Sequence, residues 1–174
     1  NHAVALTELG RIDEALPLSK QVVEGRKARL GPSHPHTLIA MNNLARIHVK
    51  ASRFNDALQV LEESRRAETT LPDDHPIRLV SLSSLAYTYR ALGQRDEAIR
   101  RYKLLLPHMR TRFGPDDDET FAETMYLARL YFETDQPREG VLLCDEFISG
   151  MRSQRRPEDP RFVKALYQTG KTLN

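Results

Sequence analysis

Histidine and cysteine are the residues of this sequence that could bind a metal ion or act as a nucleophile. The chain of 174 residues contains six histidines and one cysteine. His34 and His36 stand on either side of Pro35, but no third ligand follows at a spacing that zinc sites use. We therefore interpret the pair as part of a chain connection, and a metal site is the weaker alternative. Cys144 lies on the apolar side of a helical pattern, which favours a small core residue over a nucleophile.

The acidic and glycine-containing segments give no stronger indication of catalysis. Residues 116–119 are acidic, yet they lack the central glycine and the final glutamate of a calcium loop. The eight glycines are scattered and form no phosphate-binding loop. The sequence therefore predicts a protein that is not an enzyme and that needs no cofactor or metal ion.

The charge balance narrows the class of protein further. There are 26 basic and 24 acidic residues, which gives a net charge of +2. This balance is typical of a folded domain and argues against a nucleic-acid-binding arm. A single cysteine favours a reducing compartment, so we expect a cytoplasmic location. No apolar run approaches the roughly 20 residues that span a bilayer, and no membrane association is expected.

Two short motifs recur along the chain at a nearly constant interval. The first motif occurs four times, at residues 9–15, 51–57, 92–98 and 134–140, with intervals of 42, 41 and 42 residues. The second also occurs four times, at residues 30–35, 71–76, 113–118 and 155–160, with intervals of 41, 42 and 42 residues. Because two independent motifs keep one register, the chain is predicted to be a repeat array.

The stretches between these motifs have the period of a helix. Met41, Leu44, Ala45 and His48 fall at i, i+3, i+4 and i+7, and residues 82–89 repeat this spacing. Each repeat therefore predicts two helices, with a short turn inside the pair and a longer connection to the next pair. Small residues recur where two helices would cross: Ala15, Ala45, Ala57, Ala86, Ala98, Ala128 and Gly140.

This arrangement resembles the tetratricopeptide repeat in its long form, which occurs in kinesin light chains and in many bacterial and fungal signalling proteins. The segments that carry the resemblance are residues 31–38, 42–45 and 55–58. The resemblance implies an all-α fold, an α-solenoid of antiparallel helix pairs in a right-handed superhelix, with about nine helices. Two departures stand out. His48 replaces the leucine or tyrosine of the other repeats, and Ser52 replaces the turn glycine.

The register predicts a single array over residues 1–174. Its parts are a partial first repeat, repeats two to four, and the first helix of a fifth repeat: 1–30, 31–71, 72–113, 114–155 and 156–174. Because neither end carries a polar cap, we expect end-to-end self-association between copies. We also expect this array to be a fragment of a larger multidomain protein, such as a signalling protein or a transport adaptor.

In the resembling family, the first helix of each pair lines a concave groove that binds peptides. The side chains predicted to face this groove are Asn42, Asn43, Arg46, Lys50, Ser83, Ser84, Tyr87, Arg90, Met125, Tyr126, Arg129, Lys164, Tyr167 and Lys171. The resemblance implies that Asn42 and Asn43 hold the backbone of a bound peptide, as corresponding asparagines of kinesin light chains contact cargo peptides. The six basic residues of this set predict an acidic ligand, and its aromatic residues predict an aromatic or aliphatic anchor on that ligand.

The sequence thus predicts a non-catalytic scaffold that binds an extended, acidic peptide in its concave groove. A different class of function stays open, in which the array is a structural spacer or a self-assembly module of a regulatory protein. A nucleic-acid-binding surface is the third alternative, because basic and aromatic residues alternate along the predicted groove. The nearly neutral charge of the whole chain argues against that third alternative.

Overall fold

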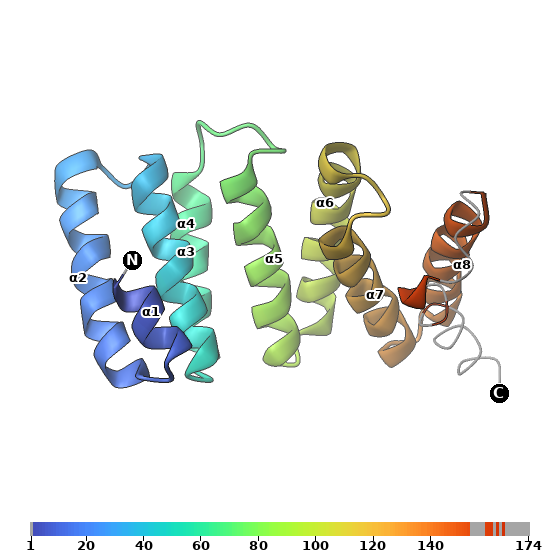
Figure 1. The fold of residues 1–174 in the computed structure, drawn as a ribbon, viewed down its shortest axis with the longest axis horizontal. Coiled ribbons are helices and arrows are strands. Elements are labelled where there is room, and N and C mark those ends of the chain that lie inside the picture. The colour runs from blue at the N-terminus through green and yellow to red at the C-terminus, as the bar shows by residue number, and fades with distance from the viewer. Residues whose placement is uncertain (1, 154–158, 162, 164, 166–174) are drawn as a thin grey trace. The chain divides into compact units, whose positions relative to one another are not determined.

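A computed structural model describes residues 2–153, 159–161, 163 and 165 of the chain (Figure 1). The described residues form helices joined by turns and loops, and no strand occurs among them. The helices with defined bounds are α1 (His2–Glu8), α2 (Ile12–Leu30), α3 (Pro35–Lys50), α4 (Phe54–Ala67), α5 (Pro76–Ala91), α6 (Arg95–Phe113), α7 (Asp118–Glu133) and α8 (Pro137–Ser153). The all-helical class predicted from the sequence is confirmed. Most of the predicted ninth helix lies outside the described residues, although residues 160, 161, 163 and 165 are helical.

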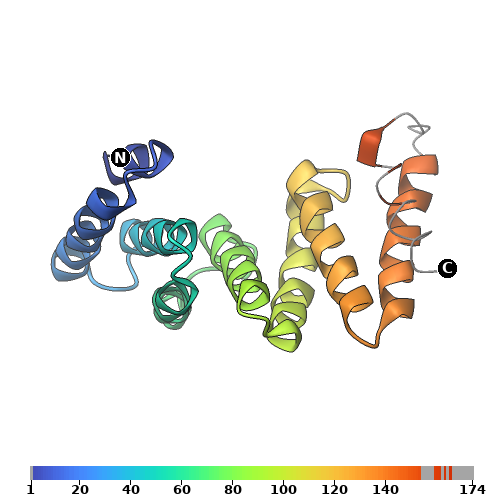
Figure 2. The ribbon, with the colours of Figure 1, turned by 90° about the horizontal axis from the view of Figure 1, so that it is seen from below.

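The chain forms two compact units, residues 1–98 and 99–174, and α6 begins in the first and continues into the second. In the first unit α3 has a central place, because it packs against α1, α2, α4 and α5 (Figures 1 and 2). In the second unit α7 packs against α8. The eight helices fall two to each of the first four predicted repeats, since the chain reverses where the two motifs recur.

Side-chain caps begin three of the first helices of the pairs. Asp117 caps α7, and its Oδ1 accepts hydrogen bonds from two backbone N–H groups at 3.0 Å each. His34 and His75 hold the equivalent positions before α3 and α5, where each Nδ1 accepts the N–H of the residue two places on at 3.2 Å. A proline follows each histidine at the start of the helix, where its missing N–H leaves no bond unmade. These histidines therefore have the structural role that was favoured over metal binding.

The same left-handed turn reverses the chain inside three of the helix pairs. Gly10, Ser52 and Gly93 have φ of +75°, +57° and +74°, and the residue after each donates its N–H to the carbonyl five places back. Among the described residues, Ser52 is the one non-glycine residue with positive φ. The fourth pair turns differently, because α7 ends at an extended Thr134 with φ of −118°. Asp135 therefore does not carry the strain that Ser52 carries.

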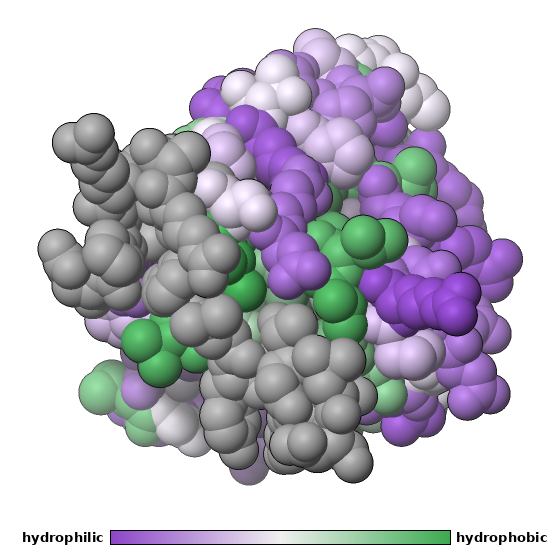
Figure 3. Space-filling model, turned by 90° about the vertical axis from the view of Figure 1, so that its right-hand side faces the viewer, coloured by the Kyte–Doolittle hydropathy of each residue, from purple (hydrophilic) through white to green (hydrophobic). Residues whose placement is uncertain are grey.

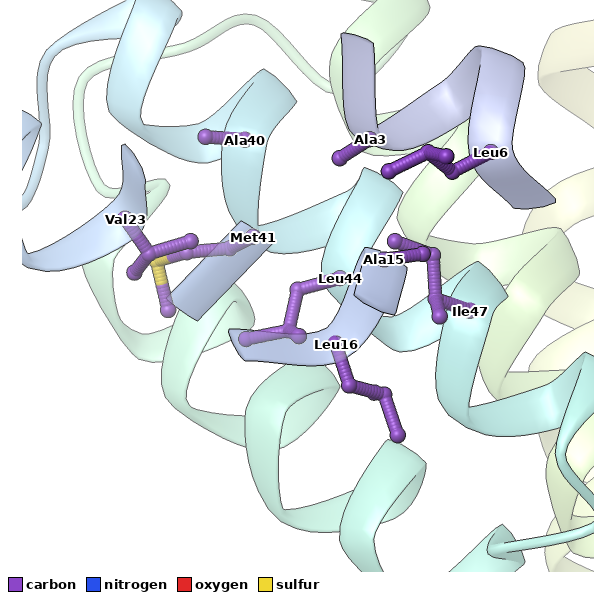
Figure 4. Packing of buried hydrophobic residues seen from close by; sticks show 9 residues of the cluster. All are labelled: Ala3, Leu6, Ala15, Leu16, Val23, Ala40, Met41, Leu44 and Ile47. Atoms are coloured by element: carbon purple, nitrogen blue, oxygen red, sulfur yellow. The ribbon is translucent and has the colours of Figure 1, made fainter. Parts of the chain in front are cut away.

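The core of the first unit lies between α1, α2 and α3 (Figure 4). Its buried residues are Ala3, Leu6, Ala15, Leu16, Val23, Ala40, Met41, Leu44 and Ile47. The alanines of this unit that were predicted to lie at helix crossings are fully buried: Ala15, Ala45, Ala57, Ala86 and Ala98. Alanine at such a position lets two helices approach closely, so a larger side chain there would overpack the core.

The core of the second unit lies between α7 and α8. Its buried residues include Phe121, Ala128, Cys144, Phe147 and Ile148. Cys144 is a free thiol with no exposed surface, which confirms that it is a small core residue.

The last of the predicted small residues, Gly140, is a glycine for a steric reason. A Cβ atom added to Gly140 would lie 2.5 Å from Cε1 of Phe132, which is closer than carbon atoms approach in proteins. The ring of Phe132 thus occupies the space that an alanine methyl group would need.

Candidate functional site

Predicted site residues come together on one side of α3 and α5 in the first unit. Along each helix they recur at intervals of three or four residues, so they share one helix face, and α3 lies beside α5. We define the α3–α5 face as Ile39, Asn43, Arg46, Lys50, Val80, Ser83, Ser84, Tyr87 and Arg90.

Large apolar side chains reach solvent on the α3–α5 face. Ile39, Val80 and Tyr87 are 39%, 53% and 38% exposed. Ile39 and Val80 occupy equivalent positions of neighbouring repeats, one on each helix. The guanidinium carbon of Arg90 lies 5.2 Å from the ring centroid of Tyr87, so a cation stacks on the aromatic ring. Exposed apolar groups next to cations can contact a ligand that carries both apolar and acidic groups.

Asn42 does not lie on this face, although the sequence predicted that it would hold a peptide backbone. It is 7% exposed, and its amide Nδ2 donates to the carbonyl of Ile77 at 3.4 Å. Its Oδ1 accepts from Oγ of Ser81 at 3.1 Å. Because both ends of the amide are bonded inside the protein, Asn42 is a structural residue that ties α3 to α5. Asn43 is the half-buried neighbour that stays beside the surface.

The bonds of Asn42 belong to a larger buried network. Oγ of Ser81 also bonds the carboxylate of Glu68, which is 2% exposed and follows α4. That carboxylate accepts from Nη1 of Arg65 at 2.8 Å and from Oγ of Ser64 at 3.3 Å. The network therefore joins α3, α4 and α5 through hydrogen bonds inside the first unit.

The cations on the predicted groove are less available than the sequence indicated. Nζ of Lys50 lies 3.0 Å from Oε1 of Glu8, and this hydrogen bond and charge hold the pKa of the Glu8 carboxyl below its usual range. In the second unit, Nε of Arg129 lies 2.7 Å from Oε1 of Glu133. Of the other cations, Arg46 is exposed on α3, and Lys164 and Lys171 lie outside the described residues, as does Tyr167. Ion pairing therefore neutralises part of the positive charge that was counted along the chain.

Of the other two predicted site residues on α7, one is buried and one is exposed. Met125 is buried in the core between α7 and α8. This contradicts its predicted place on the groove surface. Tyr126 is partly exposed, and its ring centroid lies 6.5 Å from that of Tyr102 on α6. The period of α7 explains the difference, because adjacent residues point about 100° apart and only one of the two can face solvent.

A cavity that the sequence reasoning missed lies between α2, α3 and α4 in the first unit. Its volume is about 300 Å³, and it opens on the side of α3 away from the α3–α5 face. His48 lies at one end of it and is 2% exposed. Nδ1 of His48 has no hydrogen-bond partner, so the histidine is packed in the interior with one polar atom unbonded. The signal in the sequence was the histidine itself, which stands where repeats three and four have tyrosine.

The described residues contain neither a metal-binding cluster nor a membrane-spanning helix. No group of three or more histidine, cysteine, aspartate or glutamate side chains in that part of the chain is placed to hold a metal ion. None of the helices there combines the length and the apolar character that crossing a membrane requires.

Comparison with known proteins agrees with the helix pairs. The tetratricopeptide repeat family matches residues 1–69 and again residues 81–116. The chain belongs to this family, and its repeats are like those of kinesin light chains. Crystal structures of the nearly identical TPR-like repeats of a protein assigned as a kinesin light chain, from Podosopora anserina, are 26% identical, with a TM-score of 0.90 over 98% of this chain and 81% of that one. BtubC (BKLC) from P. vanneervenii has the same fold at 17% identity, with a TM-score of 0.68 over 92% of this chain and 65% of that one.

Two curated proteins are similar in sequence to this chain. The RxLR effector protein SFI4 of Phytophthora infestans is 33% identical over 137 residues, which are 75% of this chain and 40% of that protein. A secreted RxLR effector protein of Plasmopara halstedii is 28% identical over 92 residues, which are 52% of this chain and 28% of that protein. The chain thus spans less than half the length of the curated relatives it matches.

Proposed function

We propose that this chain is a non-catalytic protein-interaction module that binds an extended peptide along the α3–α5 face. Its membership of a repeat family whose members act as interaction scaffolds supports an interaction role. The observation that carries the proposal is the exposure of Ile39, Val80 and Tyr87 beside arginines on two adjacent helices. Apolar side chains that gather on a surface mark contact sites more often than scattered ones do.

The chemistry of the face indicates an acidic peptide with an apolar anchor. An aliphatic or aromatic side chain would lie against Ile39 and Val80, and carboxylates would pair with Arg46 and Arg90. The hydroxyl groups of Ser83 and Ser84 and the amide of Asn43 can each donate and accept, which suits a peptide backbone. Because these charges lie near solvent, affinity should fall as the salt concentration rises above about 0.15 M.

The proposal is tested by replacing one arginine of the face. A library of acidic peptides with one central aromatic or aliphatic residue is titrated against the chain and against Arg46→Glu. We expect Arg46→Glu to weaken the selected peptides at least about ten-fold, chiefly by slowing association. Arg66→Glu, an exposed change on α4, is the matched control and should bind normally. Selection of basic peptides, or normal binding by Arg46→Glu, would overturn the proposal.

A structural spacer or self-assembly module is the second candidate function. Leu142 and Val163 in the second unit are exposed, and Figure 3 shows hydrophobic side chains at the surface of this end of the chain among hydrophilic ones. Such side chains would be covered if copies associated end to end. Light scattering on the same samples separates the candidates, because self-association depends on protein concentration and is insensitive to Arg46→Glu.

The setting in which the module works is also a proposal. We propose that it belongs to a larger protein, since it aligns with less than half of each curated relative. The reduced, buried Cys144 supports a reducing compartment such as the cytoplasm. Fusion of the full-length protein to a fluorescent tag would test this location, and an extracellular signal would contradict it.

A further inference from the structure

The cavity between α2, α3 and α4 has an apolar floor and polar side chains at each of its two ends. Val23, Met41, Leu44 and Val60 form the floor. At one end, Nζ of Lys27 lies 2.8 Å from Oε1 of Glu63 and 3.2 Å from Oε1 of Glu24. The Lys27–Glu63 pair joins α2 to α4, and the charged groups of this end are occupied with one another. The polar groups that could bind a ligand therefore lie at the other end, about two helical turns away.

His48, Asp56 and Lys20 form the other end of the cavity, opposite Lys27. Nδ1 of His48 is buried without a hydrogen bond, and the nearest carboxylate oxygen, Oδ2 of Asp56, is 3.7 Å away. That distance is too long for a hydrogen bond. Burial lowers the pKa of the His48 imidazole, the Asp56 charge opposes this, and the Lys20 and Arg53 charges add to it. The imidazole is therefore neutral at physiological pH, and a buried polar atom without a partner is a costly feature to keep.

The next repeat shows what fills the equivalent position. Tyr89 corresponds to His48, and its hydroxyl donates to Oε1 of Glu62 on α4 at 2.8 Å. The residue of α2 that corresponds to Glu62 is Lys20, which cannot accept a hydrogen bond. Repeat two thus has a shorter side chain than repeat three, and an unbonded imidazole nitrogen where repeat three has a bonded phenol.

We propose that this cavity binds the phenol side chain of a tyrosine presented by a partner protein. The ring would lie on the apolar floor, and the hydroxyl would enter between Nδ1 of His48 and the exposed carboxylate of Asp56. When Nδ1 of the neutral imidazole carries the proton, a hydroxyl can accept from Nδ1–H and donate its own hydrogen to the carboxylate of Asp56; in the other tautomer it can donate to Nδ1. An ammonium group would meet Lys20 and a carboxylate would meet Asp56, so a neutral polar group matches the charges of the cavity.

This cavity is a second interaction surface, separate from the α3–α5 face. Met41, Leu44 and His48 lie on the opposite side of α3 from Asn43 and Arg46, as the helical period requires. A partner could therefore occupy the cavity while a peptide lies on the α3–α5 face.

The experiment compares two small probes that differ only in the hydroxyl group. N-acetyl-tyrosinamide and N-acetyl-phenylalaninamide are titrated into the methyl-labelled chain, and the NMR shifts of the Val23, Met41, Leu44 and Val60 methyl groups are followed. We expect saturable shifts at these methyl groups, with the tyrosine probe about two- to ten-fold tighter, which is the range for one hydrogen bond. Equal affinity for the two probes, or shifts confined to the α3–α5 face, would overturn the proposal.

Two variants separate the cavity from the rest of the protein. His48→Tyr fills the space with the residue of repeats three and four, so binding of the tyrosine probe should be lost while the protein stays folded. Asp56→Ala changes an exposed side chain, removes one of the two proposed partners of the hydroxyl and should therefore reduce the preference for tyrosine over phenylalanine, even if His48→Tyr fails to fold. Asn43→Ala, on the opposite side of α3, is the matched control and should leave probe binding unchanged. Tight tyrosine binding by His48→Tyr, or an unchanged preference in Asp56→Ala, would contradict the assignment.

Discussion

Repeats two and four solve the same packing problem with different residues. In repeat two, α4 presents Ala57 at the small position, and α3 has Val49 at the position that corresponds to Phe132 of α7. In repeat four, α8 presents Gly140, and the ring of Phe132 takes the space of the missing methyl group. Volume lost on one helix is thus recovered on its partner, as close packing of the interior requires.

Repeats two and four also differ at the buried position that His48 occupies in repeat two. His48 in repeat two and Tyr131 in repeat four are both buried. Burial lowers the pKa of His48 and raises the pKa of Tyr131. The turns differ as well, since Ser52 is left-handed and Thr134 is extended. The same repeat motif therefore accommodates different buried residues and different turn conformations, and each of them requires particular residues at neighbouring positions.

The largest expected effect comes from adding a methyl group to the small position of repeat four. Gly140→Ala would ordinarily stabilise a helix by about 1 kcal/mol. Here the new Cβ meets Phe132, and we expect a net loss of about 1–2 kcal/mol from overpacking. Urea unfolding of the variant measures the loss.

A second substitution tests the cause of that loss. Phe132→Leu combined with Gly140→Ala should recover most of the stability, because the smaller side chain vacates the space. The mirror change in repeat two, Ala57→Gly, should cost about 1 kcal/mol through helix propensity. Stabilisation by Gly140→Ala alone would show that the ring of Phe132 moves aside freely.

The next effect is a pH dependence with opposite sign in the two repeats. The pKa of His48 is lowered by burial, so the unfolded chain binds a proton more readily than the folded one. Stability due to this residue is therefore present above about pH 6.5 and is lost as the pH falls below it, by no more than about 1.4 kcal/mol per pH unit. His48→Gln should flatten the dependence between pH 7.5 and 5.5.

Tyr131 gives the alkaline counterpart of this prediction. Its pKa is raised by burial and, to a smaller extent, by the charge of Glu139. The unfolded chain ionises first, so stability due to Tyr131 is present below about pH 10 and is lost as the pH rises above it. Tyr131→Phe should remove this loss in thermal unfolding curves. An unchanged curve for either variant would show that its residue does not control stability in that pH range.

The smallest effect concerns the turns. Ser52 has φ of +57°, where a side chain is strained, so Ser52→Gly should stabilise the protein by about 0.5–1 kcal/mol. Asp135→Gly should give no such gain, because Asp135 does not adopt a left-handed backbone. Thermal melts of the two variants side by side measure the difference. Equal gains would mean that a flexible residue helps at either turn regardless of backbone angle.

The repeat register was sufficient to predict the helices and the buried alanines, because these depend on local sequence and on period. The site was harder to predict. Asn42 and Met125 have the right period for a surface yet are buried, since a neighbouring helix covers the edge of each helix face. Ion pairs such as Lys50 with Glu8 join residues 42 positions apart, and no local pattern reveals them. The cavity at His48 depends on side-chain size in three helices at once.

The buried network of Asn42, Ser81 and Glu68 has a consequence for how the array can be rearranged. Repeats are often regarded as interchangeable modules that can be deleted, duplicated or shuffled. The junction between repeats two and three is not interchangeable, because Asn42 and Glu68 on one side bond Ser81 on the other, and Asn42 also bonds the carbonyl of Ile77. A copy of repeat four inserted after residue 71 would bring Thr124 and Met125 to the places of Leu82 and Ser83, and Glu123 would take the place of Ser81. The carboxylate of Glu68 would then lose its bond to the Ser81 hydroxyl, so protein engineers who extend this array should cut it elsewhere.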